Sequence, residues 1–367
     1  MERATDGTAA GIHLRGTLAR LQPIPEVRLV RLIADRLSFG GDEPYLRKSM
    51  RIARLNWVGL TSWRRGRVLL ARYHPLMLPT VLIWKLMGGL VVLSVQGSMD
   101  DVGGNAYTWL AKSRVFKRIS ALSTKLADAV IVGAPVLHDY VRDNMIGAQT
   151  ILVSIPNGVF LDDFRVARES DRPTAEDYAV FVGNLASWQG IAAMVQSTEE
   201  QDWPRGLPLV VVGDGVDRDL VVDRDGVAWK GRLPSDQAAR WLAHAYCALA
   251  LKRSDTTVGE HGYWPFKMIE SAAAGVPIVT SDAKGLVEAA EEFGNAIVVK
   301  SGDSVGAAQA VRQLMSDRQL RDRLARNGLL AAENYGWELG SEKLAALLNA
   351  VVSRSPRSKP APRADRS

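Results

Sequence analysis

The stretch PFKMIESAAAGVPIVT, residues 265–280, contains the pattern from which the fold is predicted. Pro265 suits the first turn of a helix, because its fixed backbone angle is helical and its missing N–H is not needed there. Gly275 and the aliphatic run 276–280 follow this helix. A helix that leads into a short, β-branched strand is the repeating unit of an α/β fold.

Similar aliphatic runs recur along the whole chain. They are residues 68–71, 90–95, 129–132, 150–153, 179–182, 207–212, 227–229, 246–251 and 296–299. The runs contain β-branched residues and little alternation, as expected for strands buried on both faces of a parallel sheet. A length of 367 residues favours two domains over one. We therefore predict two doubly wound, Rossmann-like α/β domains that face a cleft.

The composition also sets the predicted domain boundaries. Residues 155–177 begin with an Ile-Pro-Asn-Gly turn and continue into a polar run, so they are interpreted as a linker. The first domain is then residues 1–154 and the second is residues 155–337. Residues 338–352 are expected to form a helix that returns to the first domain. The tail 353–367 is rich in serine, proline and arginine and is expected to be disordered.

Cellular location is predicted from three further features. The single cysteine, Cys247, excludes an intrachain disulfide and is interpreted as a buried, unreactive thiol. Residues 1–10 lack the apolar core of a signal peptide. Residues 76–95 are apolar enough to test as a membrane span, but Lys85 near the middle and the pair Gly88-Gly89 favour a helix, a turn and a strand. We predict a cytoplasmic protein.

A basic surface is predicted in the first half of the chain. No acidic residue occurs between residues 47 and 99, and tryptophans lie at positions 57 and 63. Between positions 47 and 72 the basic residues are Arg47, Lys48, Arg51, Arg54, Arg64, Arg65, Arg67 and Arg72. Each basic residue near an anionic bilayer contributes about 1 kcal/mol, and tryptophan favours the interface. We predict docking on the inner face of the plasma membrane; the alternative is a solvated basic face.

Five motifs of the second half occur in a fixed order. They are residues 155–159 (IPNGV), 181–190 (FVGNLASWQG), 212–215 (VGDG), 231–234 (GRLP) and 265–277 (PFKMIESAAAGVP). With these motifs, residues 11–352 resemble glycosyltransferase family 4, whose members are retaining enzymes of the GT-B fold. The resemblance implies transfer of a hexose from a UDP- or GDP-sugar to a hydroxyl of a glycan or lipid-linked acceptor, in envelope or extracellular polysaccharide or glycolipid synthesis. It implies no cofactor and no metal, an acceptor-binding first domain and a nucleotide-sugar-binding second domain.

The helix that begins near Pro265 is predicted to bind the donor diphosphate. Its first amides and its macrodipole favour an anion, and Lys267 adds a full charge, so this lysine is a catalytic candidate. By the resemblance, Glu270 accepts hydrogen bonds from the ribose diol. The other donor-binding candidates are Gly183, Asn184, Gln189, Gly213, Arg232, Arg253, Glu260, Gly262, Pro265 and Phe266. The alternative is an ordinary amphipathic helix with an exposed Lys-Glu pair.

Some candidates depart from the family pattern. The family often has a second glutamate eight residues before Glu270, where this chain has Gly262 and the nearest carboxylate is Glu260. The basic residues that grip the diphosphate would align with Asn184 and Gln189, which are uncharged. Lys267, together with a nearby arginine, is therefore expected to supply the charge on the phosphate side, unless donor binding is weak.

In the first half, residues 11–16 (GIHLRG) are similar to the glycine loop of the family, which approaches the donor phosphate. Gly11 is therefore a donor-binding candidate and His13 a catalytic one. Gln96 is the third catalytic candidate: it occupies the place where many members have a histidine near the transferred sugar, and it is expected to hydrogen-bond a sugar hydroxyl. Such a loop should follow a buried strand, yet only the polar residues 1–10 precede it. We expect a missing first strand, which an upstream extension would supply; alternatively, residues 26–33 form an edge of a reorganised sheet.

Other functions compete with this hypothesis. Residues 223–225 (DRD) have the carboxylate spacing of metal-dependent glycosyltransferases, but they lie in a short connection before a strand, and no metal site is predicted. A GT-B-fold sugar-nucleotide epimerase and a non-catalytic nucleotide-sugar-binding protein are the alternatives. The arginine- and tryptophan-rich surface would also suit nucleic acid, with salt-sensitive binding, but no nucleic-acid partner is predicted.

Overall fold

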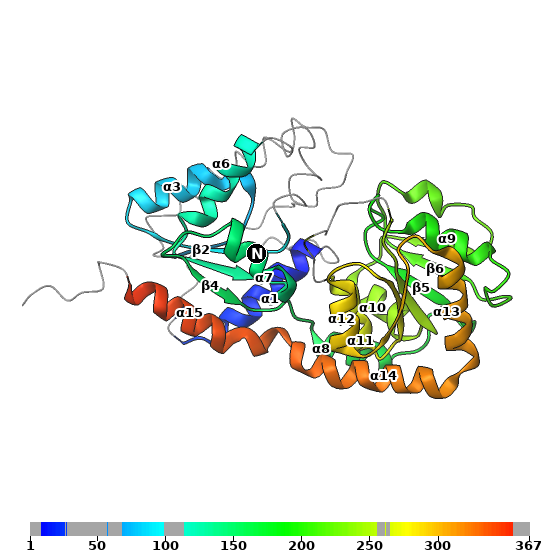
Figure 1. The fold of residues 1–367 in the computed structure, drawn as a ribbon. Coiled ribbons are helices and arrows are strands. Elements are labelled where there is room, and N and C mark those ends of the chain that lie inside the picture. The colour runs from blue at the N-terminus through cyan, green and yellow to red at the C-terminus, as the bar shows by residue number, and fades with distance from the viewer. Residues whose placement is uncertain are drawn as a thin grey trace, which may run out of the picture.

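A computed structural model describes residues 9–25, 27, 57, 68–98, 114–254, 261 and 265–354. These residues form two α/β domains, each built on a parallel sheet (Figure 1). All ten predicted strands coincide with observed strands, and their ends differ by two residues at most. The predicted α/β class with two parallel sheets is therefore confirmed.

The first domain contains four parallel strands in the order β1-β2-β3-β4. They are β1 (Val68–Arg72), β2 (Leu90–Val95), β3 (Ala129–Val132) and β4 (Ile151–Ser154). β2 and β3 are buried over their whole length, which explains their uninterrupted aliphatic sequences. The order of these described strands follows the sequence, without the reversal that defines a doubly wound sheet.

Helices cover both faces of this first sheet. α1 (Ala9–Leu21) and α15 (Ser341–Ser353) contact each other and lie on one face, where Leu344 and Leu347 of α15 pack with Leu90 and Val92 of β2. The other face is covered by α3 (Leu78–Leu86), α6 (Arg114–Lys125) and α7 (His138–Asn144), with the short 3-10 helices η2 (Pro75–Met77) and η3 (Pro135–Leu137). The last described helix, α15, therefore completes the core of the first domain.

The second domain has a six-stranded parallel sheet in the order β10-β9-β8-β5-β6-β7. The strands are β5 (Ala179–Val182), β6 (Leu209–Val212), β7 (Val227–Gly231), β8 (Cys247–Ala250), β9 (Ile278–Ser281) and β10 (Ala296–Val299). The chain leaves β5 in one direction through β6 and β7, and then returns to the other side of β5 through β8. In an open α/β sheet, ligands bind at such a reversal, outside the carboxyl ends of the strands.

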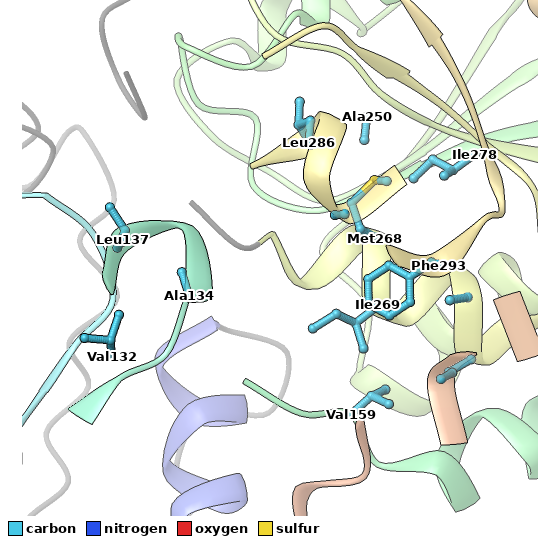
Figure 2. Packing of buried hydrophobic residues seen from close by; sticks show 14 of the residues in the cluster. Val132, Ala134, Leu137, Val159, Ala250, Met268, Ile269, Ile278, Leu286 and Phe293 are labelled. Atoms are coloured by element: carbon cyan, nitrogen blue, oxygen red, sulfur yellow. The ribbon is translucent and has the colours of Figure 1, made fainter. Parts of the chain in front are cut away.

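The helices of the second domain also form two layers. They are α8 (Leu161–Glu169), α9 (Ile191–Glu199), η4 (Arg218–Leu220), α10 (Ser235–Ala243), α11 (Phe266–Ala274), α12 (Leu286–Phe293), α13 (Ser304–Ser316) and α14 (Arg318–Ala332). Figure 2 shows Met268 and Ile269 of α11 close to Ile278 and Phe293 in the core on one face of the sheet. α9 and α13 cover the opposite face.

Two predictions about local structure are wrong. Residues 11–16 are not a loop but part of α1, and Gly16 serves packing: a Cβ there would lie 2.1 Å from the ring of Trp337. The predicted linker 155–177 contains α8, whose side chains Phe164 and Ala167 are buried because α8 packs against α10 and α11. Neither contact is visible in the local sequence, since the partners lie far along the chain.

The apolar stretch 76–95 folds as predicted into a helix, a turn at Gly88 and a strand. Lys85 lies at the end of α3, where its Nζ is 2.6 Å from Asp128 Oδ1. Among the residues that the structure describes, no helix has the length and apolarity needed to cross a membrane.

Several predictions fall outside the described residues. These are Glu260 and Gly262, most of the basic stretch 47–67, Glu26 and residues 28–33 of the suggested edge strand, and the tail beyond residue 354. Val27, within that suggested edge strand, lies in neither a helix nor a strand. Trp57 of the basic stretch is exposed.

Candidate functional site

The start of α11 brings Lys267 to the carboxyl edge of the second sheet. Pro265 is the N-cap residue, with φ −72° and ψ 132°, and no side chain caps the first amides of the helix. The Lys267 side chain extends over β5: its Nζ lies 5.0 Å from the centre of the Phe181 ring. A Cβ added to Gly183 would be 2.8 Å from that same Nζ. The charge of Lys267 and the uncapped amides of α11 therefore lie together where an anion would bind.

Lys267 and Glu270 form a half-buried pair one turn apart on α11. Burial lowers the pKa of Lys267 from 10.5 to about 8, an effect that the negative charge of Glu270 partly opposes. Burial likewise raises the pKa of Glu270 from 4.5 to about 7, and Lys267 partly opposes that. The predicted alternative of an exposed Lys-Glu pair is therefore wrong. Charges that have lost part of their hydration interact strongly with a charged or polar ligand that binds beside them.

Glycines at the ends of β5 and β6 leave the carboxyl edge open. Gly183 has φ +150° and Gly213 has φ +146°, values that disfavour other residues. A Cβ on Gly213 would lie 1.8 Å from the carbonyl oxygen of Gly183, so the two loops can pack only without side chains. Gly231 ends the neighbouring strand β7. The exposed Arg232 follows it, two strands and roughly 10 Å from β5.

The loop after β5 is held by side chains that were expected to bind the donor. Gln189 is 5% exposed, and its Nε2 donates to the Asn184 carbonyl oxygen at 2.7 Å. The exposed Arg253 donates from Nη1 to the carbonyl oxygen of Ser187 at 3.1 Å. Gln189 therefore closes the loop from inside, while the Asn184 side chain stays exposed.

Lys252 is a further basic residue at this edge that the sequence interpretation missed. It follows β8, the strand next to β5, and is buried. Its backbone pairs with Gln189 and its N–H donates to Ser281 Oγ at 2.9 Å. The sequence signal that could have identified Lys252 is its place directly after the aliphatic run 246–251.

On the first domain, His13 of α1 meets Gln96, which follows β2. The Gln96 Nε2 atom is 2.7 Å from His13 Nε2 and donates to Ser94 Oγ at 2.8 Å. The other end of the carboxamide, Oε1, accepts from Asn157 Nδ2 at 2.7 Å. Gln96 thus cross-links three segments instead of standing free for a sugar hydroxyl. Ser94 and Asn157 were not among the predicted site residues.

The imidazole of His13 is neutral over the physiological range. Burial lowers its pKa from 6.5 to about 3, and the positive charges of Arg72 and Arg20 act in the same direction. Gly11, two residues earlier, is buried in the first turn of α1. It therefore cannot offer the open glycine loop that was predicted.

Trp337 joins the two halves of the site. It belongs to η6 (Trp337–Gly340), which follows η5 (Glu333–Tyr335) in the returning crossover, and it is fully buried. Its ring lies edge-on to His13 at a centroid distance of 6.0 Å, and 6.2 Å from the ring of Phe266. Because Phe266 is the first residue of α11, one aromatic ring connects the His13 network with the helix of Lys267.

Comparisons with known proteins identify a family match and several relatives. Residues 176–317 match the family model described as glycosyl transferases group 1. The chain is 27% identical over 236 residues to the glycogen synthase of Mycobacterium tuberculosis. The aligned residues cover 62% of this chain and 55% of that protein. It is 28% identical over 171 residues to the lipopolysaccharide core biosynthesis glycosyltransferase LpsD of Rhizobium meliloti, covering 44% and 46% of the two chains. The matches thus span about half the length of these relatives.

A similar fold occurs in the solved structure of Anabaena Alr3699/HepE in complex with UDP-glucose. The TM-score is 0.63, with 14% sequence identity over 84% of this chain and 84% of the other. At this identity the likeness concerns the fold. The family match over residues 176–317 thus assigns the second domain to glycosyl transferases group 1, the glycosyltransferase family 4, and the fold of the two domains is the GT-B fold.

Proposed function

We propose that this protein transfers a hexose from a UDP- or GDP-sugar to a hydroxyl of a glycan or lipid-linked acceptor, with retention at the anomeric carbon and without a metal ion. The observation that carries the proposal is the position of Lys267, which lies over Phe181 and against Gly183 at the uncapped start of α11. The names of the relatives, a glycogen synthase and a lipopolysaccharide core glycosyltransferase, support a glycan or glycolipid product.

The donor diphosphate would lie between α11 and the glycine-ended strands β5 and β6. Lys267 and the first amides of α11 would bind its oxygens, and Glu270 would accept hydrogen bonds from the ribose hydroxyls. Negative charge on the diphosphate grows as the bond to the sugar breaks, so Lys267 stabilises the transition state more than the ground state. The departing diphosphate oxygen takes the proton of the acceptor hydroxyl as the new glycosidic bond forms.

Calorimetric titration of UDP and GDP, with release of the nucleotide from candidate sugar donors as the turnover assay, tests this proposal. Glu270→Gln is expected to weaken nucleotide binding, whereas the control Glu291→Gln, an exposed position on α12, leaves it unchanged. Activity that survives EDTA and a product with the donor's anomeric configuration would support a metal-independent, retaining reaction. Release of free sugar or an epimer without an acceptor would instead support the epimerase, and tight binding without turnover would support a nucleotide-sugar-binding protein.

We further propose that the first domain works on the inner face of the plasma membrane. The basic stretch 47–72 motivated this idea, and α6 supports it with an unusual distribution of side chains. Its buried side carries Ser120, Ser123 and Thr124, whereas the aliphatic side chains Val115, Ile119 and Leu122 are exposed beside Arg118 and Lys125. Val115 alone is 64% exposed. An apolar and basic helix face suits an anionic bilayer.

Flotation with liposomes at low and high salt tests the membrane proposal. Ile119→Glu is expected to reduce binding to anionic vesicles, because it adds a repelled charge to the apolar face. The matched control is Val305→Glu, an exposed valine on α13 of the second domain. Equal binding to neutral and anionic vesicles would contradict the electrostatic part of the proposal.

A further inference from the structure

The carboxamide of Gln96 makes hydrogen bonds on both of its ends. Its Nε2 lies 2.8 Å from Ser94 Oγ and 2.7 Å from His13 Nε2, and its Oε1 lies 2.7 Å from Asn157 Nδ2. The residues come from β2 and its end, from α1, and from the crossover between the domains. These contacts form a chain from Asn157 through Gln96 to His13, which we call the amide relay.

The direction of the relay determines which nitrogen of His13 carries the proton. Asn157 donates to Gln96 Oε1, so Gln96 has its N–H groups on the side of His13, and His13 Nε2 must accept. The proton of the neutral ring is then on Nδ1. If both carboxamides were reversed, His13 Nε2 would have to donate instead.

Burial of Asn157 favours the first direction. Asn157 is 4% exposed, and its Oδ1 has no hydrogen-bond partner in the part of the chain that the structure describes. Reversal would exchange this unpaired acceptor for an unpaired Nδ2 donor. Unpaired buried N–H groups are rarer in proteins than carbonyl oxygens with unused lone pairs.

The other hydrogen-bonding atom of the His13 ring is Nδ1. Its Nδ1 makes no hydrogen bond to any described residue, while the ring is fixed by Gln96 on one side and lies edge-on to Trp337. Burial and the charges of Arg72 and Arg20 keep the ring neutral. A neutral histidine of fixed tautomer is a directional donor to an oxygen atom.

We propose that Asn157 and Gln96 are positioning residues that hold His13 as its Nδ1–H tautomer, so that this N–H donates to an oxygen of the bound sugar nucleotide. The identity of the ligand rests on the proposed function, whereas the hydrogen-bonded relay does not depend on it. His13 is the group that touches the donor, and Asn157 acts on it only through Gln96. Trp337, which contacts both His13 and Phe266, keeps this donor close to the helix of Lys267.

Nitrogen-15 NMR of the histidines in the full chain, without nucleotide, tests the relay. The chain has 5 histidines, so a His13→Gln variant assigns the His13 signals. We expect the wild type to show the shifts of a neutral ring protonated on Nδ1. In Asn157→Asp the new carboxylate cannot donate, so the Gln96 carboxamide turns to donate to it, and the proton of His13 moves to Nε2. Gln96→Glu is expected to move the proton in the same way, and it keeps the test valid if the buried Asn157 variant does not fold.

Turnover is measured on the same proteins. Both relay variants should lose about 10- to 100-fold in kcat/KM, as expected when one well-aligned hydrogen bond to the donor is removed. The control Asn349→Asp, an exposed position on α15, should change neither the tautomer nor the rate. A wild-type proton on Nε2, or a proton that stays on Nδ1 in both relay variants, would overturn the relay.

Calorimetry separates the relay from the proposed function. If UDP or GDP binds but the wild-type proton is on Nε2, the relay fails and the donor site stands. If neither nucleotide binds while the tautomer is as expected, the proposed function fails, and with it the ligand assigned to His13.

Discussion

Replacing Lys267 with methionine is expected to stabilise the nucleotide-free protein while it removes most of the turnover. The pKa of Lys267 falls from 10.5 to about 8, because burial in the folded protein disfavours its charge. At 1.36 kcal/mol for each pKa unit, keeping this charge at pH 7 costs about 3 kcal/mol, or about 1 to 3 kcal/mol after allowance for solvent near a half-buried group. Methionine has a similar length and retains contact with the Phe181 ring without that cost.

The expected stabilisation depends on pH in a definite direction. A lowered lysine pKa means that the unfolded chain holds the proton more tightly, so the charged lysine destabilises the fold below pH 8. This destabilisation disappears as pH rises from about 8 to 10.5. The advantage of Lys267→Met should therefore be full at pH 7 and absent near pH 11.

Thermal melting without nucleotide measures this effect, with an expected rise of about 2 to 10 °C at pH 7. Turnover should fall about 100- to 1000-fold, as when an oxyanion-hole donor is removed. Lys343→Met, at an exposed position of α15, is the control and should change neither quantity. Because Glu270 loses its partner in this variant, the double variant with Glu270→Gln should melt at least as high. A lower melting temperature in both variants, or turnover close to wild type, would refute the reasoning.

Three further predictions concern the same site. Glu270→Gln should weaken binding of UDP or GDP by about 1.5 to 3 kcal/mol in calorimetry, since a charge-assisted hydrogen bond to the ribose is lost; unchanged affinity would remove Glu270 from the donor site. The pH profile of kcat/KM should be bell-shaped, falling below about pH 7 as Glu270 is protonated and above about pH 8 as Lys267 loses its proton; a flat profile between pH 6 and 9 would contradict these roles. Gly183→Ala should lower turnover and melting temperature together, because its φ of +150° strains alanine and the new methyl group would meet Lys267 Nζ at 2.8 Å; a fully active variant would show that Lys267 need not lie against β5.

The sequence alone predicts the parts of this fold that local chemistry fixes. The strands were correctly placed because a buried parallel strand needs an uninterrupted aliphatic run, as in β2 and β3. The start of α11 next to Pro265 and the glycines at the ends of β5 and β6 follow from backbone geometry that few other residues allow. From these features the sequence predicts that Lys267 and Glu270 lie at the carboxyl edge of the second sheet, but it does not predict that they are half-buried.

Only the tertiary structure decided how the remaining side chains are used. Gln189 turns inward to the Asn184 carbonyl oxygen, and residues 11–16 form a helix whose Gly16 packs against Trp337, 321 positions later in the chain. His13, Gln96 and Asn157 each lie more than 60 residues from the next, yet their hydrogen bonds are 2.7 Å long. Local sequence determines strand and turn chemistry. A hydrogen bond between distant segments exists only because two domains and their crossovers pack in one arrangement, and no periodicity or motif encodes that arrangement residue by residue.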